Sequence, residues 1–169
     1  LYGAISNLCG GRWGTVQLDW IPIAAEHLSP DDLQILFYGL LHFESPLAER
    51  IAVFRRDVEN MQSFLRDRGT FKPKWQVVGA SYAFVGMILG AYDPTQYTYY
   101  HAGNLKAALE RLGASWPRMQ GEQRYVEVCR VVREAHDALL KADVPVRDLI
   151  DTQSLLYVHA ESMKKEKRP

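Results

Sequence analysis

The stretch that decides the fold of this chain is a long amphipathic segment, residues 45–69, which reads SPLAERIAVFRRDVENMQSFLRDRG. Its apolar residues recur at alternating spacings of four and three, which is the period of one face of an α-helix. These residues are Leu47, Ile51, Phe54, Val58, Met61 and Leu65. Ser45 and Pro46 are a typical start of a helix, and Gly69 is a typical end. The pattern therefore predicts a long helix whose apolar stripe faces a hydrophobic core.

The segment before this helix contains the start signals of another helix. Ser29 is a suitable N-cap, Pro30 fits the first helical position, and Asp31 and Asp32 favour the positive end of the helix dipole. Residues 1–28 are less regular, because CGGRWG predicts a turn and TVQLDWIPI alternates like a short strand that a proline interrupts. We expect residues 1–28 to form a strap, either a small hairpin or a coil across the helices.

Four further helices are predicted downstream. Residues 74–91 are apolar nearly all round, which predicts the buried central helix of a bundle, and Asp93-Pro94 ends it. Glycines within this helix predict close packing against it. Weaker periodic patterns predict helices over residues 104–112, 122–142 and 148–160. The inward faces are expected to carry Leu105, Ala108, Leu109 and Leu112 in the first of these, closed by Gly113, and Tyr125, Val128, Cys129, Val132, Ala135 and Leu139 in the second.

These elements together predict an all-α protein. The expected architecture is a compact bundle of about six helices around the central apolar helix, preceded by the short irregular or hairpin segment. The helical domain is expected to span residues 29–160. Residues 161–169 end in the charged run MKKEKRP, and we expect them to be an exposed linker tail.

The composition of the chain restricts its partners and its location. Lys plus Arg number 20 and Asp plus Glu number 20, so the chain has no net charge with which to coat nucleic acid, although a local basic face is compatible with this balance. Two cysteines, Cys9 and Cys129, are too few for a disulfide framework, which favours a cytoplasmic location. No segment is long and apolar enough to predict a membrane span, and no signal-peptide pattern is present.

No constellation of residues predicts catalysis by this chain. The sequence lacks phosphate-binding glycine motifs, metal-ligand spacings and a nucleophile elbow. Its histidines are scattered, and a lone helical histidine such as His136 is typical of a surface or of a satisfied core position. We therefore expect no catalytic residue, no metal and no cofactor.

Tyrosines are concentrated in the segment YDPTQYTYYH, residues 92–101. If this segment is extended, Thr98 and Tyr100 share one side and the neighbouring tyrosines share the other. Because both sides then carry aromatic rings, most of these rings, that of Tyr97 included, are expected to be wedged between helices. Tyr100 and His101 precede the next helix and are expected to be the exposed pair that contacts a base, a peptide or another domain.

Two basic groups are further candidates for contact with phosphate. The first comprises Arg55, Arg66, Lys72 and Lys74, and the second comprises Arg111, Arg118 and Arg124, close in sequence to Trp116. Arginine beside aromatic surface is typical of stacking and phosphate sites. The alternatives are a solvated helix face for the first group and the rim of a hydrophobic core for the second.

Several segments, taken in order, resemble a known family. SPLAERIAVF is followed by LGAYDPTQYTYYHAGNLKAALERLG, then by GEQRYVEVCRVVREA and RDLIDTQSLLYV. This order resembles the helical N-terminal region of McrB-type AAA+ GTPases of modification-dependent restriction systems, and of related AAA+ defence proteins. The resemblance covers residues 45–160. The matching positions are Pro94, Tyr97, Tyr100, Leu109, Leu112, Gly113, Asp151, Gln153, Ser154, Leu155 and Tyr157.

The resemblance implies a non-catalytic DNA-recognition module at the front of a larger NTPase. Its implied partners are DNA, bound in a salt-dependent way, the AAA+ domain of the same protein and a nuclease subunit, with oligomerisation through the downstream domain. The alternative is a helical protein-interaction or regulatory module that positions a partner or sensor domain. The neutral charge balance and the helical build favour this alternative.

Overall fold

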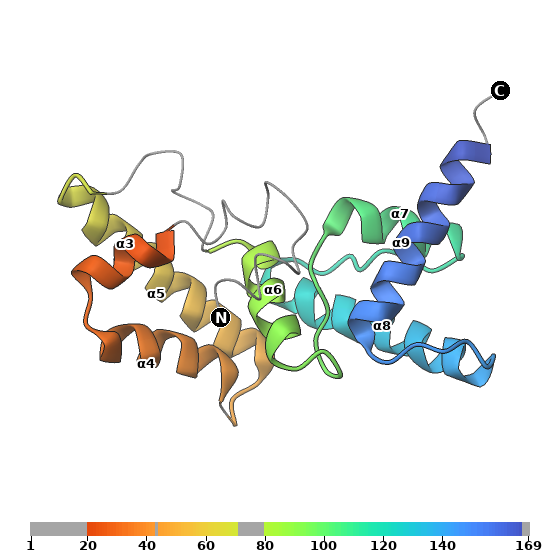
Figure 1. Ribbon diagram of the computed structural model, residues 1–169, viewed down its shortest axis with the longest axis horizontal. Helices are drawn as coiled ribbons and strands as arrows, with labels where there is room; N and C mark the ends of the chain where they lie inside the picture. The colour runs from red at the N-terminus through yellow and green to blue at the C-terminus, as the bar shows by residue number, and fades with distance from the viewer. Residues whose placement is uncertain (1–19, 43, 71–79, 167–169) are drawn as a thin grey trace. The chain divides into compact units, whose positions relative to one another are not determined.

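The computed structural model describes residues 20–42, 44–70 and 80–166, and these residues form helices joined by turns and loops (Figure 1). The predicted all-α class is confirmed, since the described part of the chain contains seven helices and no strand. None of the described helices is both long enough and apolar enough to cross a membrane. The chain divides into two compact units, residues 1–88 and residues 89–169.

The first unit contains helices α3 (Trp20–His27), α4 (Pro30–Leu41) and α5 (Leu47–Asp67), and α3 packs against both of the others. The helix α3 lies where the sequence predicted part of a strap, so that expectation is wrong for residues 20–27. A proline within the first turn is compatible with a helix, because the first four N–H groups have no intrahelical partner. The remainder of the predicted strap, residues 1–19, lies outside the described residues.

The predicted start of α4 is confirmed in detail. The backbone N–H of Asp32 donates to Ser29 Oγ at 3.1 Å, and the backbone N–H of Ser29 donates to Asp32 Oδ2 at 3.3 Å, which is a capping box. The start of α5 differs, because Pro46 itself is the N-cap and no side chain caps the helix. The serine before it therefore does not have the capping role that its sequence suggested.

The predicted stripe of α5 forms the core of the first unit. Its residues Ile51, Phe54, Val58, Met61 and Leu65 are buried, and only the first member, Leu47, is half-buried. The Phe54 ring lies 5.8 Å from the ring of Phe37 in α4 and 6.2 Å from that of Phe84. The main amphipathic prediction is thus confirmed position by position.

The apolar helix α6 (Tyr82–Tyr92) is shorter than the predicted 74–91 at its start. Residues 74–79 lie outside the described residues, and residues 80–81 form a turn. Ser81 Oγ accepts a hydrogen bond from the Phe84 backbone N–H at 3.1 Å, which caps the first turn. Burial of residues 84–90 agrees with the predicted all-round apolar character.

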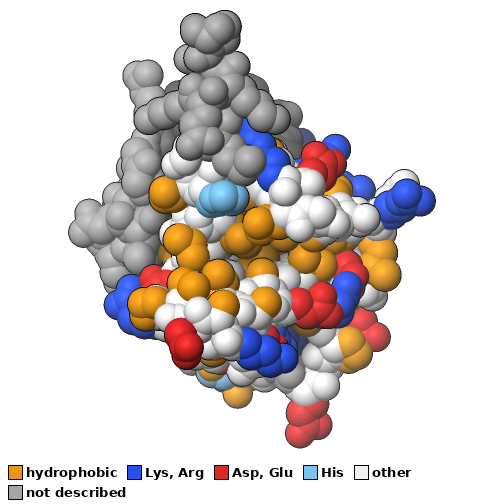
Figure 2. All heavy atoms as spheres, turned by 90° about the vertical axis from the view of Figure 1, so that its right-hand side faces the viewer, with side chains coloured by type: hydrophobic (Ala, Val, Ile, Leu, Met, Phe, Trp, Pro, Cys, Tyr) orange, Lys and Arg blue, Asp and Glu red, His pale blue; other side chains and the backbone are white. Residues whose placement is uncertain are grey.

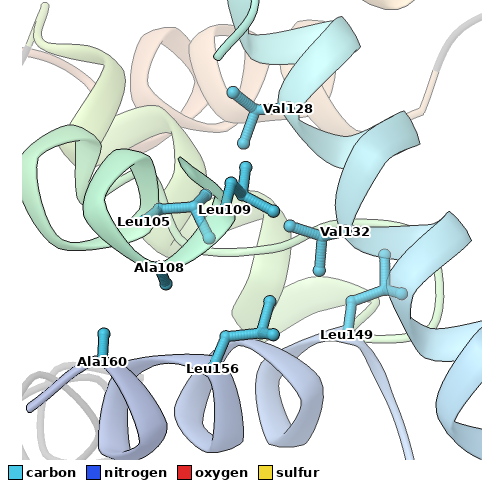
Figure 3. Packing of buried hydrophobic residues seen from close by; sticks show 8 residues of the cluster. All are labelled: Leu105, Ala108, Leu109, Val128, Val132, Leu149, Leu156 and Ala160. Atoms are coloured by element: carbon cyan, nitrogen blue, oxygen red, sulfur yellow. The ribbon is translucent and has the colours of Figure 1, made fainter. Parts of the chain in front are cut away.

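The second unit contains α7 (Ala102–Arg111), α8 (Gly121–Lys141) and α9 (Leu149–Glu166), and α9 packs against both α7 and α8. Its core draws on all three helices, as Figure 3 shows: Leu105, Ala108, Leu109, Val128, Val132, Leu149, Leu156 and Ala160. The prediction that Leu112 points inward is wrong. This residue follows the last helical residue of α7 as its C-cap and is half-exposed.

Helix α9 also corrects the predicted tail. It continues through residue 166, so most of the segment expected as an exposed linker is helical, and residues 167–169 lie outside the described residues. Lysine and glutamate are good helix formers, and the sequence offers no glycine or proline that would end the helix before Pro169.

Three helix ends share one backbone device. After α5, α7 and α8 a residue with positive φ follows the C-cap: Gly69 (71°), Gly113 (77°) and Asp143 (58°). In each case two backbone hydrogen bonds close the last turn, such as Ala114 N–H to Leu109 O at 2.9 Å and Val144 N–H to Leu139 O at 3.0 Å. This is the Schellman arrangement, and the two glycine ends agree with the sequence prediction.

Candidate nucleic-acid interface

The tyrosine segment begins at the turn that ends α6. The carboxylate of Asp93 accepts hydrogen bonds from the Thr95 backbone at 3.0 Å, from the Thr95 hydroxyl at 2.6 Å and from the Gln96 side chain at 2.8 Å. These donors, chiefly the Thr95 hydroxyl, lower the pKa of Asp93. The predicted stop at Asp93-Pro94 is therefore built as a hydrogen-bonded turn.

The centre of the segment is Thr98, a residue that sequence reasoning did not select. It is fully buried, and its carbonyl accepts a hydrogen bond from the Tyr125 hydroxyl at 2.8 Å. Its own hydroxyl donates to Gln153 in α9. Burial raises the pKa of Tyr125 well above its usual range, so this phenol stays protonated and acts as a donor. The segment is thus fastened to both α8 and α9.

The side that Thr98 shares with Tyr100 faces the core, which corrects the expected exposure of Tyr100. The Tyr100 ring is half-buried and lies 6.1 Å from the ring of Tyr125 and 6.5 Å from that of Trp116. The other side is also packed, because Tyr99 ring carbons come within 3.1 Å of a Cβ placed at Gly90. The predicted wedging of the rings therefore extends to Tyr100.

His101 is exposed, as expected, but it lies apart from the predicted arginines. It lines a small hollow of about 240 Å³ together with Ser154 and Tyr157 of α9. Neither Trp116 nor any arginine is among the described residues that line this hollow. Tyr100 and His101, which were predicted to be one exposed pair, therefore differ: Tyr100 packs against the core, and His101 is exposed beside α9.

Two of the predicted phosphate-binding arginines bind the protein itself. Arg55 donates from Nε to Ala80 O at 2.5 Å and from a terminal nitrogen to the Tyr82 hydroxyl at 2.7 Å, with its guanidinium 4.3 Å from the centre of the Tyr82 ring. Arg111 donates to Ala160 O and ties α7 to α9. Both side chains are half-buried and hold helices together.

The remaining members of the first basic group do not form a described site. Arg66 is exposed in the last turn of α5. Lys72 and Lys74 lie outside the described residues. The predicted basic edge around the end of α5 therefore stays a prediction.

The structure does bring together three of the predicted residues. Trp116, Arg118 and Arg124 line a hollow of about 560 Å³, to which α7 adds Lys106 and Glu110. We call this the basic hollow. Sequence reasoning missed Lys106, although it stands one helical turn before Glu110, whose carboxylate lies 3.7 Å from the Lys106 ammonium. The hollow thus carries three cations and one carboxylate beside an indole ring.

The side chains of the basic hollow differ in how firmly they are held. Arg124 donates from Nε to Met119 O at 2.7 Å, which uses one of the five N–H donors of its guanidinium. Arg118 is exposed in the loop between α7 and α8. Trp116 is half-buried and packs on the core of the second unit. An anion that enters the hollow therefore meets one positioned guanidinium, two further cations, one carboxylate and an aromatic wall.

The second unit also carries an apolar groove between α7, α8 and α9. Its volume is about 570 Å³, and its walls include the exposed side chains of Leu112 and Leu155. Figure 2, which views the chain from the side of these helices, shows apolar side chains across this face with charged ones around them. Glu134 and His159 are the titratable residues among the described residues that line it, and no lysine or arginine is among them.

Comparisons with protein-family models, curated proteins and solved structures found no match to this chain. The resemblance to the McrB-type N-terminal region therefore stays a prediction. Within the described ranges, no group of three or more His, Cys, Asp or Glu side chains is placed to hold a metal ion.

Proposed function

We propose that this chain is a non-catalytic module that engages DNA through the basic hollow, as part of a modification-dependent restriction or defence NTPase. The observation that supports the contact is the convergence of Trp116, Arg118 and Arg124 with Lys106 in one hollow. The NTPase context rests on the family resemblance alone. In this context an AAA+ domain and a nuclease subunit are partners, and the module assembles into an oligomer through the AAA+ domain.

The size of the basic hollow sets the expected strength of binding. Its three cations contact at most about three phosphates, and each contact contributes about −0.9 to the slope of log K against log salt concentration. We therefore expect weak, steeply salt-sensitive binding with a slope of about −2 to −3. The carboxylate of Glu110 lies in the same hollow and opposes anion binding, so charge alone gives little affinity.

The proposal is tested with the variant Arg118→Ala, because this side chain is exposed and its loss leaves the fold intact. Fluorescence anisotropy with a labelled duplex at low salt should show weaker binding and a slope shallower by about 0.9. Lys141→Ala is the matched control, because it removes one exposed cation from the end of α8, outside the hollow.

Methylated and unmethylated duplexes of the same sequence are compared in the same assay. A difference between them supports recognition of modified DNA, and equal binding supports contact with the backbone only. Absence of binding at low salt, or equal losses for Arg118→Ala and Lys141→Ala, contradicts a DNA contact at the basic hollow.

A further inference from the structure

Among the described residues of the first unit, the most exposed large apolar side chains gather along one groove between α4 and α5. Ile35 is 70% exposed, Tyr38 is 51% exposed and Val53 is 44% exposed, and all three line the groove. Its volume is about 670 Å³, with Leu36 and Phe54 also contributing. Apolar surface that gathers in one groove, and does not scatter singly, is typical of binding sites.

The groove follows two neighbouring helices for about two turns. Its lining runs from Asp31 to Gly39 along α4, which is about 12 Å of helix axis, and from Val53 to Asp57 along α5. The helix α3 packs against both α4 and α5, but none of its described residues lines the groove, so the groove is a part of the α4–α5 pair that α3 does not fill. Binding of an amphipathic helix in an apolar groove places residues spaced by three and four positions against the floor.

The charges along the groove select the sign of the partner. Among the described residues that line it, Asp31 and Asp57 are acidic and none is basic. The nearest cation on Asp57 is Arg56, at 3.0 Å, but the Arg56 side chain is 66% exposed, and such an exposed pair is weak. Cations on an incoming helix therefore find fixed carboxylates beside the apolar floor.

We propose that the α4–α5 groove is a docking site for a partner protein, which inserts an amphipathic helix with apolar residues on one face and Lys or Arg at its margin. A protein-interaction module is the alternative function predicted from the sequence. This groove is the surface that such a module would use, and a basic amphipathic helix is the partner that it would bind. The groove lies within the first unit, uses no residue of the basic hollow, and stands whether or not the hollow binds DNA.

The decisive variant is Gly39→Leu, because Gly39 lines the groove within α4. A Cβ built at this position meets no described atom outside its own helix within 4 Å. Leucine also favours a helix more than glycine does, so the variant should fold with an unchanged or higher Tm while its side chain occupies the groove. Gly103→Leu is the matched control, since that glycine also lies in a helix, α7, and also has open space around it.

The probe is a labelled synthetic helix of about 14 residues, with leucines at alternating spacings of three and four and lysines beside them. Anisotropy with the full chain should give saturable binding that Gly39→Leu weakens by about tenfold or more and Gly103→Leu leaves unchanged. The same peptide with glutamates for lysines should bind several-fold more weakly. Asp57→Asn should reduce this preference, whereas Asp67→Asn, on the same helix outside the groove, should not.

Four outcomes would overturn the proposal: no saturable binding of the lysine peptide, equal binding to Gly39→Leu, equal binding of the two peptides, or self-association that Gly39→Leu abolishes. The last outcome would assign the groove to a second copy of the chain. DNA binding by Gly39→Leu is measured in parallel. It should equal that of the wild-type chain, so failure of the groove and failure of the basic hollow are told apart.

Discussion

At the scale of single residues, Thr98 and Tyr100 show how one short segment is fixed in the second unit. The Thr98 carbonyl accepts a hydrogen bond from the Tyr125 hydroxyl. The Tyr100 ring packs beside the Tyr125 ring on the same side of the segment. Polar and apolar contacts thus meet at one tyrosine of α8. A buried phenol without its acceptor loses a hydrogen bond that water cannot replace, so the segment and α8 depend on each other.

Replacement of Tyr100 should mainly lower stability. We expect Tyr100→Ala to reduce the free energy of unfolding by about 2–3 kcal/mol, because the half-buried ring leaves a cavity beside Trp116. His101→Ala should change it by less than about 0.5 kcal/mol, since that side chain is exposed. Urea denaturation of both variants measures the difference. Equal losses at the two positions would contradict the placement of Tyr100 against the core.

At the scale of elements, the ends of the helices contain residues with left-handed backbone conformation. α7 and α8 both close with a residue in the left-handed region, but α7 uses Gly113 and α8 uses Asp143. Aspartate tolerates this region better than most residues, yet its Cβ still costs energy that glycine avoids. The backbone at the end of α8 is therefore slightly strained at Asp143, and a glycine at this position would remove the strain.

Asp143→Gly should raise the free energy of unfolding by about 0.5–1 kcal/mol, because it removes this strain and keeps the Schellman hydrogen bonds. Gly113→Ala is the reciprocal change, and it should lower stability by about 1 kcal/mol. No described atom lies within 4 Å of its added Cβ, so the cost comes from the backbone alone. Thermal and urea unfolding of both variants provide the measurement, and a loss of stability in Asp143→Gly would contradict the assignment.

Features that depend on residues close in sequence are predicted better than features that depend on residues far apart in sequence. The stripe of α5 and the glycine ends of α5 and α7 depend on neighbours three to five residues away, and both were predicted correctly. The exposure of Tyr100 and the partners of Arg55 and Arg111 depend on residues 16 to 49 positions away in the sequence, which periodicity does not report. The basic hollow lies between these cases, because Trp116, Arg118 and Arg124 are within eight positions of one another, whereas Lys106, which sequence reasoning missed, is 18 positions from Arg124.

At the scale of the whole molecule, basic and acidic residues balance, and the ion pairs among the described residues are local. The chain carries 20 basic and 20 acidic residues. Within the described ranges, the ion pairs join residues one to four positions apart, such as Arg130 with Glu127 and Arg147 with Asp151. Exposed local pairs of this kind contribute little to stability.

Salt should therefore leave the stability of the protein almost unchanged. Raising NaCl from about 0.05 to 0.5 M should alter the free energy of unfolding by less than about 1 kcal/mol, because the pairs are local and the net charge is zero. Urea denaturation across this range is the measurement. A loss above about 2 kcal/mol would show that charge pairs between distant segments stabilise the fold.

The buried thiol of Cys129 allows local opening of the second unit to be measured by the rate of thiol alkylation. The side chain is 5% exposed, and burial raises the pKa of the thiol, so thiolate is scarce while the unit is closed. Cys9 lies outside the described residues and is replaced by serine for this experiment, so that Cys129 is the single thiol of the chain. Alkylation then proceeds only during openings that expose the Cys129 thiol. The alkylation rate then reports how often α8 separates from its neighbours, without denaturant.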